Sequence, residues 1–112
     1  MKRFQIINMF RILGRVKLNK IEDKNLRNAL ISNHLKMFRV AKENDEYIVS
    51  LRNQFDADAT AALNEAYDIY ANEEIDVPLE KINREAFADV IAASNIEFTL
   101  GDFVLLDAIL ED

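Results

Sequence analysis

Residues 22–55 carry an apolar pattern of helical spacing that no Gly or Pro interrupts. Positions on one side of this segment recur in alternating steps of four and three residues, the heptad spacing of a helix that packs along a seam. The seam consists of Leu30, His34, Met37, Ala41, Asn44, Ile48, Leu51 and Phe55. Ile31, Leu35 and Phe38 widen the apolar stripe toward its N-terminal end, so two faces need cover there.

This predicted helix is long for a chain of 112 residues. About 34 helical residues at 1.5 Å each form a rod of about 50 Å, whereas a compact domain of this size has a radius of gyration near 13 Å. The rod must therefore project, be flanked by a second helix, or be covered by another subunit. We take the eight seam residues as the candidate interface with a partner.

Two short segments have the alternation typical of strands. Residues 3–7 have a β-like texture, and residues 74–79 alternate polar and apolar side chains up to Pro78, which confines a strand to a sheet edge or ends it. An isolated strand cannot satisfy its own backbone hydrogen bonds. We therefore expect residues 3–7 to pair with residues 75–79 in a minor two-stranded β element.

Further helices are predicted on both sides of the long one. Residues 8–13 have helical spacing, with Asn8 as a possible N-cap and Gly14 as a stop that can take a positive φ. Residues 57–72 place alanines and tyrosines on one face, and Asp56 or Asp58 can cap the start.

The C-terminal part predicts two more helices. Asn83 can cap one that runs through Ser94, with Phe87, Val90 and Ile91 inward. The stretch from Thr99 to Asp102 resembles a capping box and starts a last helix. The apolar set of that helix is Phe103, Leu106, Ile109 and Leu110. The whole pattern predicts a mainly α protein, one domain over residues 1–112, with a long helix packed against further helices.

Composition excludes several classes of protein. The chain has no Cys, which excludes disulfides, thiolate metal sites and a cysteine nucleophile. Its 50% apolar and 30% charged residues are typical of a folded globular protein. No apolar run approaches the roughly 20 residues that span a bilayer, and the start lacks the features of a signal peptide. We expect no membrane partner and a cytoplasmic location.

Charge is divided unevenly along the chain, although the net charge is −6. Residues 1–56 carry twelve Lys or Arg against six acids, and residues 57–112 carry two against fourteen. The basic half can pack beside the acidic half of the same molecule, subunits can associate head to tail, or each half can have its own partner. The net acidic charge and the scattered basic residues argue against nucleic acid as that partner.

One acidic motif resembles catalytic and metal-binding signatures. Asp56, Asp58 and Thr60 have the spacing of an aspartate-nucleophile phosphatase motif, but no buried strand precedes them. As a calcium loop, the motif has Ala61 where Gly is needed and Tyr67 where Glu is needed. We therefore interpret these acids as residues near a helix start and predict no catalytic, cofactor or metal site.

Two polar residues interrupt the seam. His34 is the only histidine, and the sequence offers it neither a nucleophile nor a set of metal ligands, so we expect a partly buried or interface imidazole. Asn44 either fixes the register of the seam or sits at a frayed edge.

The order of elements resembles a family of small phage and prophage proteins of unknown function. The stretches that carry the resemblance are Leu13-Gly14, Lys17-Leu18, residues 72–82 and residues 99–110. In the family a Pro often follows the Lys-Leu pair, where this chain has Asn19. The resemblance implies a phage-derived protein, in the cytoplasm of a bacterial host cell or associated with a virion, and supplies no catalytic residue.

These patterns lead to two functional hypotheses. The first is a non-enzymatic interaction or assembly protein that acts through the long helix and the charge polarity, and that forms a homo-oligomer or binds a protein partner. The alternative is a phage-borne inhibitor or regulator that binds a host protein through its acidic C-terminal half.

Overall fold

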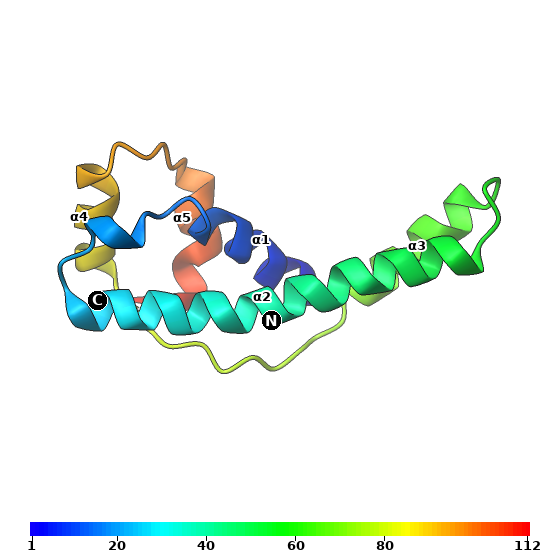
Figure 1. Cartoon of the computed structure of the whole chain (residues 1–112), viewed down its shortest axis with the longest axis horizontal. Helices are drawn as coiled ribbons and strands as arrows, with labels where there is room; N and C mark the ends of the chain where they lie inside the picture. The colour runs from blue at the N-terminus through cyan, green and yellow to red at the C-terminus, as the bar shows by residue number, and fades with distance from the viewer.

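The structure is a computed structural model that describes all 112 residues. Its longest element is helix α2 (Lys24–Gln54), whose 31 residues extend over about 46 Å. The molecule measures 50 × 26 × 22 Å, so α2 runs along nearly its whole length (Figure 1). The prediction of one unbroken helix over residues 22–55 is confirmed, with two residues fewer at its start and one fewer at its end.

Shorter elements cover the two halves of α2 separately. They are α1 (Arg3–Leu13), a 3₁₀ turn (Leu18–Lys20), α3 (Thr60–Ala71), β1 (Ile82–Asn83), α4 (Arg84–Ala93), α5 (Leu100–Leu106), a second 3₁₀ turn (Asp107–Ile109) and β2 (Leu110–Glu111). Helices α1, α4 and α5 gather on the N-terminal half of α2, whereas α3 folds back along its C-terminal half and forms a projecting hairpin (Figure 1). The mainly α prediction is confirmed.

Helix α1 begins at Arg3, so the β-like texture predicted for residues 3–7 is wrong. Ile6, Met9 and Leu13 are buried in the hydrophobic core, where α1 packs against α2 and α5. These side chains share one face only if the segment is helical, and burying that face outweighs a weak local strand preference.

Both ends of α1 differ in detail from the prediction. Asn8 lies inside the helix rather than at its N-cap, and the Lys2 backbone N–H at the actual start donates to Gln5 Oε1 at 2.9 Å. The helix stops at Gly14 as predicted, but the φ of Gly14 is −62°. A positive φ is therefore not the reason for a glycine here.

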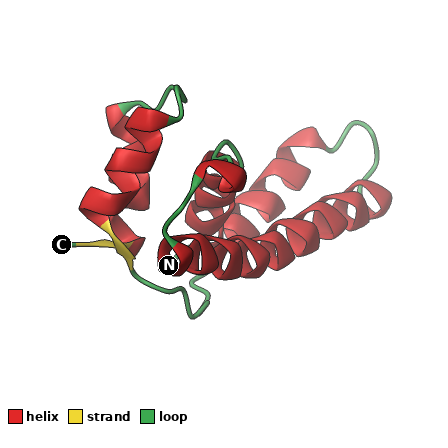
Figure 2. Cartoon of the chain, turned by 60° about the vertical axis from the view of Figure 1, so that its left-hand side comes forward, coloured by secondary structure: helices red, strands yellow, loops and turns green.

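The minor β element joins other residues than those predicted. β1 and β2 pair in parallel, with Ile82 opposite Leu110, and they lie beside the C-terminus (Figure 2). Just before the two predicted segments, a single antiparallel bridge joins Lys2 to Glu74. The expected pairing of residues 3–7 with 75–79 is therefore wrong, because residues 3–7 are committed to α1.

The segment between α3 and β1 crosses α2 as an extended loop rather than a strand (Figure 1). Asn33, fully buried on α2, donates from Nδ2 to the Glu80 carbonyl at 2.8 Å and accepts from the Glu80 N–H at 2.7 Å. Lys36 Nζ donates to the Pro78 carbonyl at 2.6 Å. Side chains of α2 thus supply the hydrogen bonds that a neighbouring strand would otherwise provide.

The caps of the last two helices are as predicted, and the cap of α3 is not. Asn83 Oδ1 accepts from the Ala86 N–H at 2.9 Å. Thr99 and Asp102 form the reciprocal capping box, with distances of 3.0 and 3.1 Å. Helix α3 starts after Ala59 without a side-chain cap, so neither Asp56 nor Asp58 has the capping role predicted for it.

A clasp joins the start of α1 to the end of α3. The Arg3 guanidinium lies 3.7 Å from the centre of the Tyr70 ring and donates to the Tyr70 carbonyl at 2.7 Å and to Glu73 Oε2 at 2.9 Å. The other partner of Tyr70 is Tyr47 on α2, stacked on it with 3.8 Å between ring centroids. The clasp connects the projecting hairpin to the rest of the molecule.

Truncating Met37 to Ala tests the buried side of α2. Met37 is fully buried in the core, so we expect Met37→Ala to lower the free energy of unfolding by about 2–5 kcal/mol. Ile69, 64% exposed on α3, provides the control, and Ile69→Ala should change stability by less than about 0.5 kcal/mol. Urea denaturation measures both, and equal losses would contradict this orientation of α2.

Candidate interaction surface

The seam predicted as an interface lies mostly inside the molecule. Leu30, Met37, Asn44 and Leu51 are buried. The other four members, His34, Ala41, Ile48 and Phe55, are half-buried. Helix α1 packs on the N-terminal part of α2 and α3 on the C-terminal part. The four buried residues are therefore corrected from interface to interior, because other segments of the same chain exclude solvent from them.

Asn44 is a buried polar residue within that interior seam. It is 2% exposed, which excludes the frayed edge that the sequence left open. Its Oδ1 atom has no hydrogen-bond partner. A buried acceptor without a hydrogen bond destabilises the folded state, because it has lost its hydrogen bonds to water and gained none in the protein. The α2–α3 contact is thus less strongly stabilised than an all-apolar seam of the same length.

His34 lies where α1 crosses α2. Its ring stacks on Phe10 with 4.6 Å between the centroids, and it borders a hollow of about 80 Å³. Leu13, Gly14, Val16, Leu18 and Leu30 line the rest of this hollow. Burial lowers the pKa of His34 from its usual 6.5. A neutral imidazole packed on a phenyl ring, with no carboxylate to orient it, acts as a packing group.

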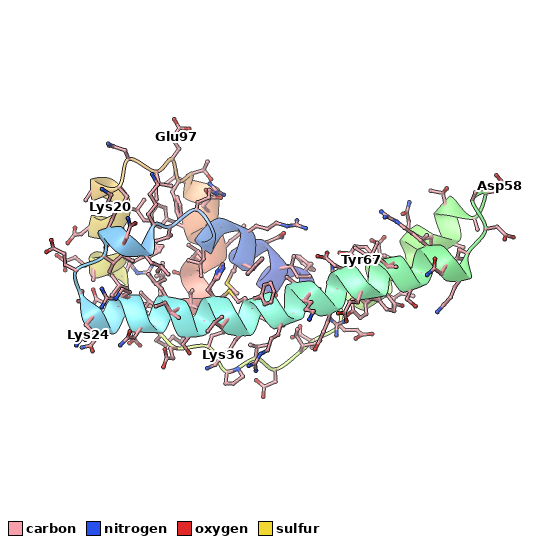
Figure 3. The ribbon with its side chains drawn as sticks, viewed as in Figure 1. Lys20, Lys24, Lys36, Asp58, Tyr67 and Glu97 are labelled. Atoms are coloured by element: carbon pink, nitrogen blue, oxygen red, sulfur yellow. The ribbon has the colours of Figure 1, made fainter.

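The acidic motif of Asp56, Asp58 and Thr60 lies exposed at the turn between α2 and α3. Asp58 marks the tip of the projecting hairpin in Figure 3. No group of three or more His, Asp or Glu side chains in the structure could hold a metal ion.

A second face of α2 is open to solvent and carries apolar side chains. Leu35 and Phe38 are 57% and 49% exposed, and Val49 on the same side is 55% exposed. Ile31, at the same helical spacing, is half-buried. We call these four residues, with Lys24, Arg27, Lys42 and Asp45 at the same helical spacing, the open face of α2.

The widening of the stripe by Ile31, Leu35 and Phe38 was the sequence signal for this face. The prediction of a partner on the seam depends on the length of the helix, yet a long apolar repeat serves equally well for packing within the molecule. Val49 gave no such signal, since polar and charged residues separate it from the other three. Only the positions of α1 and α3 show which side of α2 stays uncovered.

Ion pairs within the chain leave the charges of α2 unused. Arg3 pairs with Glu73 at 2.9 Å, and Arg15 pairs with Asp102 at 3.1 Å. These contacts join the basic half to the acidic half, as the first interpretation of the charge asymmetry predicts. The remaining ion pairs involve the N-terminus and Arg84, so no charged side chain of α2 takes part in one.

The Arg15–Asp102 pair sits on the α5 cap. The pKa of Asp102 is lowered, first by the hydrogen bond from the Thr99 backbone and then by Arg15. Three apolar residues of α5 remain exposed beside it, namely Leu100, Val104 and Leu105. They form a smaller apolar patch within the acidic half.

Comparison of the chain with protein-family models, with curated proteins and with solved structures finds no match. None of the helices combines the length and the apolar character needed to cross a lipid bilayer. The interpretation of the surface therefore depends on its own geometry and charge.

The lowered pKa of His34 predicts how stability changes with pH. Because the unfolded chain binds this proton more readily, the His34 contribution is complete above the usual pKa of 6.5 and is lost as the pH falls below it toward the folded-state value. Replacing His34 with Gln should remove this part of the pH dependence. Urea denaturation of both proteins at about pH 7.5 and pH 5.5 measures it, and identical pH dependence would contradict the burial of His34.

Proposed function

We propose that this protein is a non-enzymatic interaction or assembly protein that binds another protein through the open face of α2. The observation that carries the proposal is the exposure of Leu35, Phe38 and Val49 at helical spacing on the longest helix. Single exposed apolar residues are common on protein surfaces, but an aligned stripe of them on one helix is typical of a docking face.

The charges around the open face support a protein rather than a nucleic acid as the partner. Leu35 and Phe38, rather than cations, occupy the centre of the open face, and Asp45 on the same face would repel phosphates. An apolar centre with charges along its edge is the usual anatomy of a protein–protein interface. The layout shared with small phage proteins fits a role in phage assembly, and we propose such a setting.

A second candidate is the inhibitor or regulator that binds a host protein through the acidic C-terminal half. The exposure of Leu100 and Val104, 86% and 73%, favours it. Glu97, Glu111 and Asp112 are exposed acids in the same half, and they would attract a basic site on the host protein. This candidate requires a 1:1 complex that weakens as salt increases.

Photo-crosslinking in the host cell distinguishes the two candidates. A photoreactive phenylalanine analogue replaces Leu35 in one variant, Val104 in a second, and Ile69 in a third as control. Ile69 is 64% exposed and lies on α3, outside both surfaces. We expect a discrete covalent adduct from position 35 and none from position 69.

Mass spectrometry of the adduct identifies the protein bound at position 35, which is either another protein or a second copy. An adduct from position 104 alone would favour the inhibitor. Absence of any adduct from position 35 would contradict the interaction function proposed for the open face.

A further inference from the structure

We propose that the open face of α2 binds the same face of a second copy, with the two helices antiparallel and related by a two-fold axis. This inference rests on the proposed function and names its partner. Alternative occupants are another protein, or the α5 patch of a second copy in a head-to-tail arrangement.

The first argument is the distribution of charge along α2. Its first part carries five bases and no acid: Lys24, Arg27, Lys36, Arg39 and Lys42. The following segment, through the turn to α3, carries five acids, Glu43, Asp45, Glu46, Asp56 and Asp58, against one base, Arg52. The helix is thus basic in its N-terminal half and acidic beyond it. Figure 3 shows Lys24 and Asp58 at the two ends of this arrangement.

This charge separation determines the orientation of the pair. Two antiparallel copies place each basic half beside the acidic half of the other, whereas parallel copies place like charges together. None of these charged side chains is used in an ion pair within the chain. Apart from Lys36, which donates to the Pro78 carbonyl, they are therefore available to a second copy.

The second argument is that the spacing of the open face is self-complementary. Leu35, Phe38, Lys42, Asp45 and Val49 follow steps of three, four, three and four. In an antiparallel pair centred near Val40, the Ile31 of one copy lies opposite Val49 of the other. The same register places Phe38 opposite Lys42, Leu35 opposite Asp45, and Lys24 beside the turn that holds Asp56. Ile31 thus meets Val49, the Lys42 cation meets the Phe38 ring, and Lys24 lies near an opposite charge.

The shape of the α2 surface also suits packing against a second helix. A shallow hollow on this side is lined only by α2 residues, namely Asn28, Ile31, Ser32, Leu35, Lys36 and Arg39. Residues i, i+3, i+4 and i+7 of one helix form the hole that receives a side chain of a partner helix. The six residues form two consecutive holes of this kind.

The third argument is the length of the overlap. Helix α2 spans Lys24–Gln54 and has its middle at Arg39, so a two-fold axis near Val40 overlaps the two helices almost completely. The contact is isologous and closed, and it leads to a dimer rather than a filament. A head-to-tail contact between the open face of one copy and α5 of the next could instead repeat from copy to copy and form a filament.

Single introduced cysteines test the relative orientation of the two α2 helices without background cross-linking, because the chain has no cysteine of its own. The variants Ile31→Cys and Val49→Cys are purified, mixed and treated with a short bis-maleimide. In the antiparallel dimer we expect a cross-link between the two variants. Ile31→Cys alone should give little product, since 18 residues separate Ile31 from Val49 and the two Ile31 positions then lie about 27 Å apart along the axis.

Efficient cross-linking of Ile31→Cys with itself would overturn the antiparallel orientation. Cross-linking of Leu35→Cys with Val104→Cys, in place of the expected pair, would overturn the choice of the α2 face in favour of α5.

Sedimentation equilibrium tests the association itself, and we expect the wild-type protein to form a dimer. Leu35→Glu combined with Val49→Glu should give a monomer with an unchanged helical circular dichroism spectrum, because both side chains are more than half exposed. Ile69→Glu, the matched control on α3, should remain a dimer. A wild-type monomer at all concentrations tested, or a dimer that persists in the double variant, would overturn the inference.

The outcomes separate this inference from the proposed function. A monomer that still forms an adduct from position 35 with another protein would overturn self-association while the interaction function stands. A monomer without any adduct would overturn both.

Discussion

The structure depends on how a helix of 31 residues is covered by a chain of only 112. Helix α2 is about as long as the molecule, and no single layer of the remaining residues extends along it. The chain covers it in two parts, with α1, α4 and α5 on one half and α3 on the other. The radius of gyration of 16.3 Å, compared with about 13 Å for a compact domain of this size, reflects this division.

The two parts differ in what holds them to α2. The N-terminal half has a continuous apolar core, stacking of Phe10 on His34, and the Asn33 hydrogen bonds that pin the connecting loop. The hairpin half has half-buried apolar contacts and the unpaired Asn44 acceptor, and it depends on the Arg3–Tyr70 clasp for its link to α1. We therefore expect the hairpin to open more readily than the core, as local opening follows the density of buried contacts.

Both proposals follow from the part of the α2 surface that the other helices do not cover. Intramolecular ion pairs use Arg3, Arg15 and Arg84, which lie outside α2. The apolar residues Leu35, Phe38 and Val49 and the unpaired charges of α2 remain together on one face. A second copy placed antiparallel would cover the apolar residues and pair the charges in one contact. Burying apolar side chains supplies affinity, and the charge pattern selects the orientation.

The sequence by itself determined the elements whose signals are local. The uninterrupted heptad spacing of residues 22–55, the stop at Gly14, and the caps at Asn83 and Thr99 all depend on residues within one or two turns of each other. Only the tertiary structure decided that residues 3–7 form a helix, that Ile82 pairs with Leu110, and that the seam is interior while Leu35 and Phe38 stay outside. The seam and the open face have the same apolar spacing, so the sequence cannot distinguish them. The distinction lies in where α1 and α3 pack, and that depends on contacts between residues far apart in the chain.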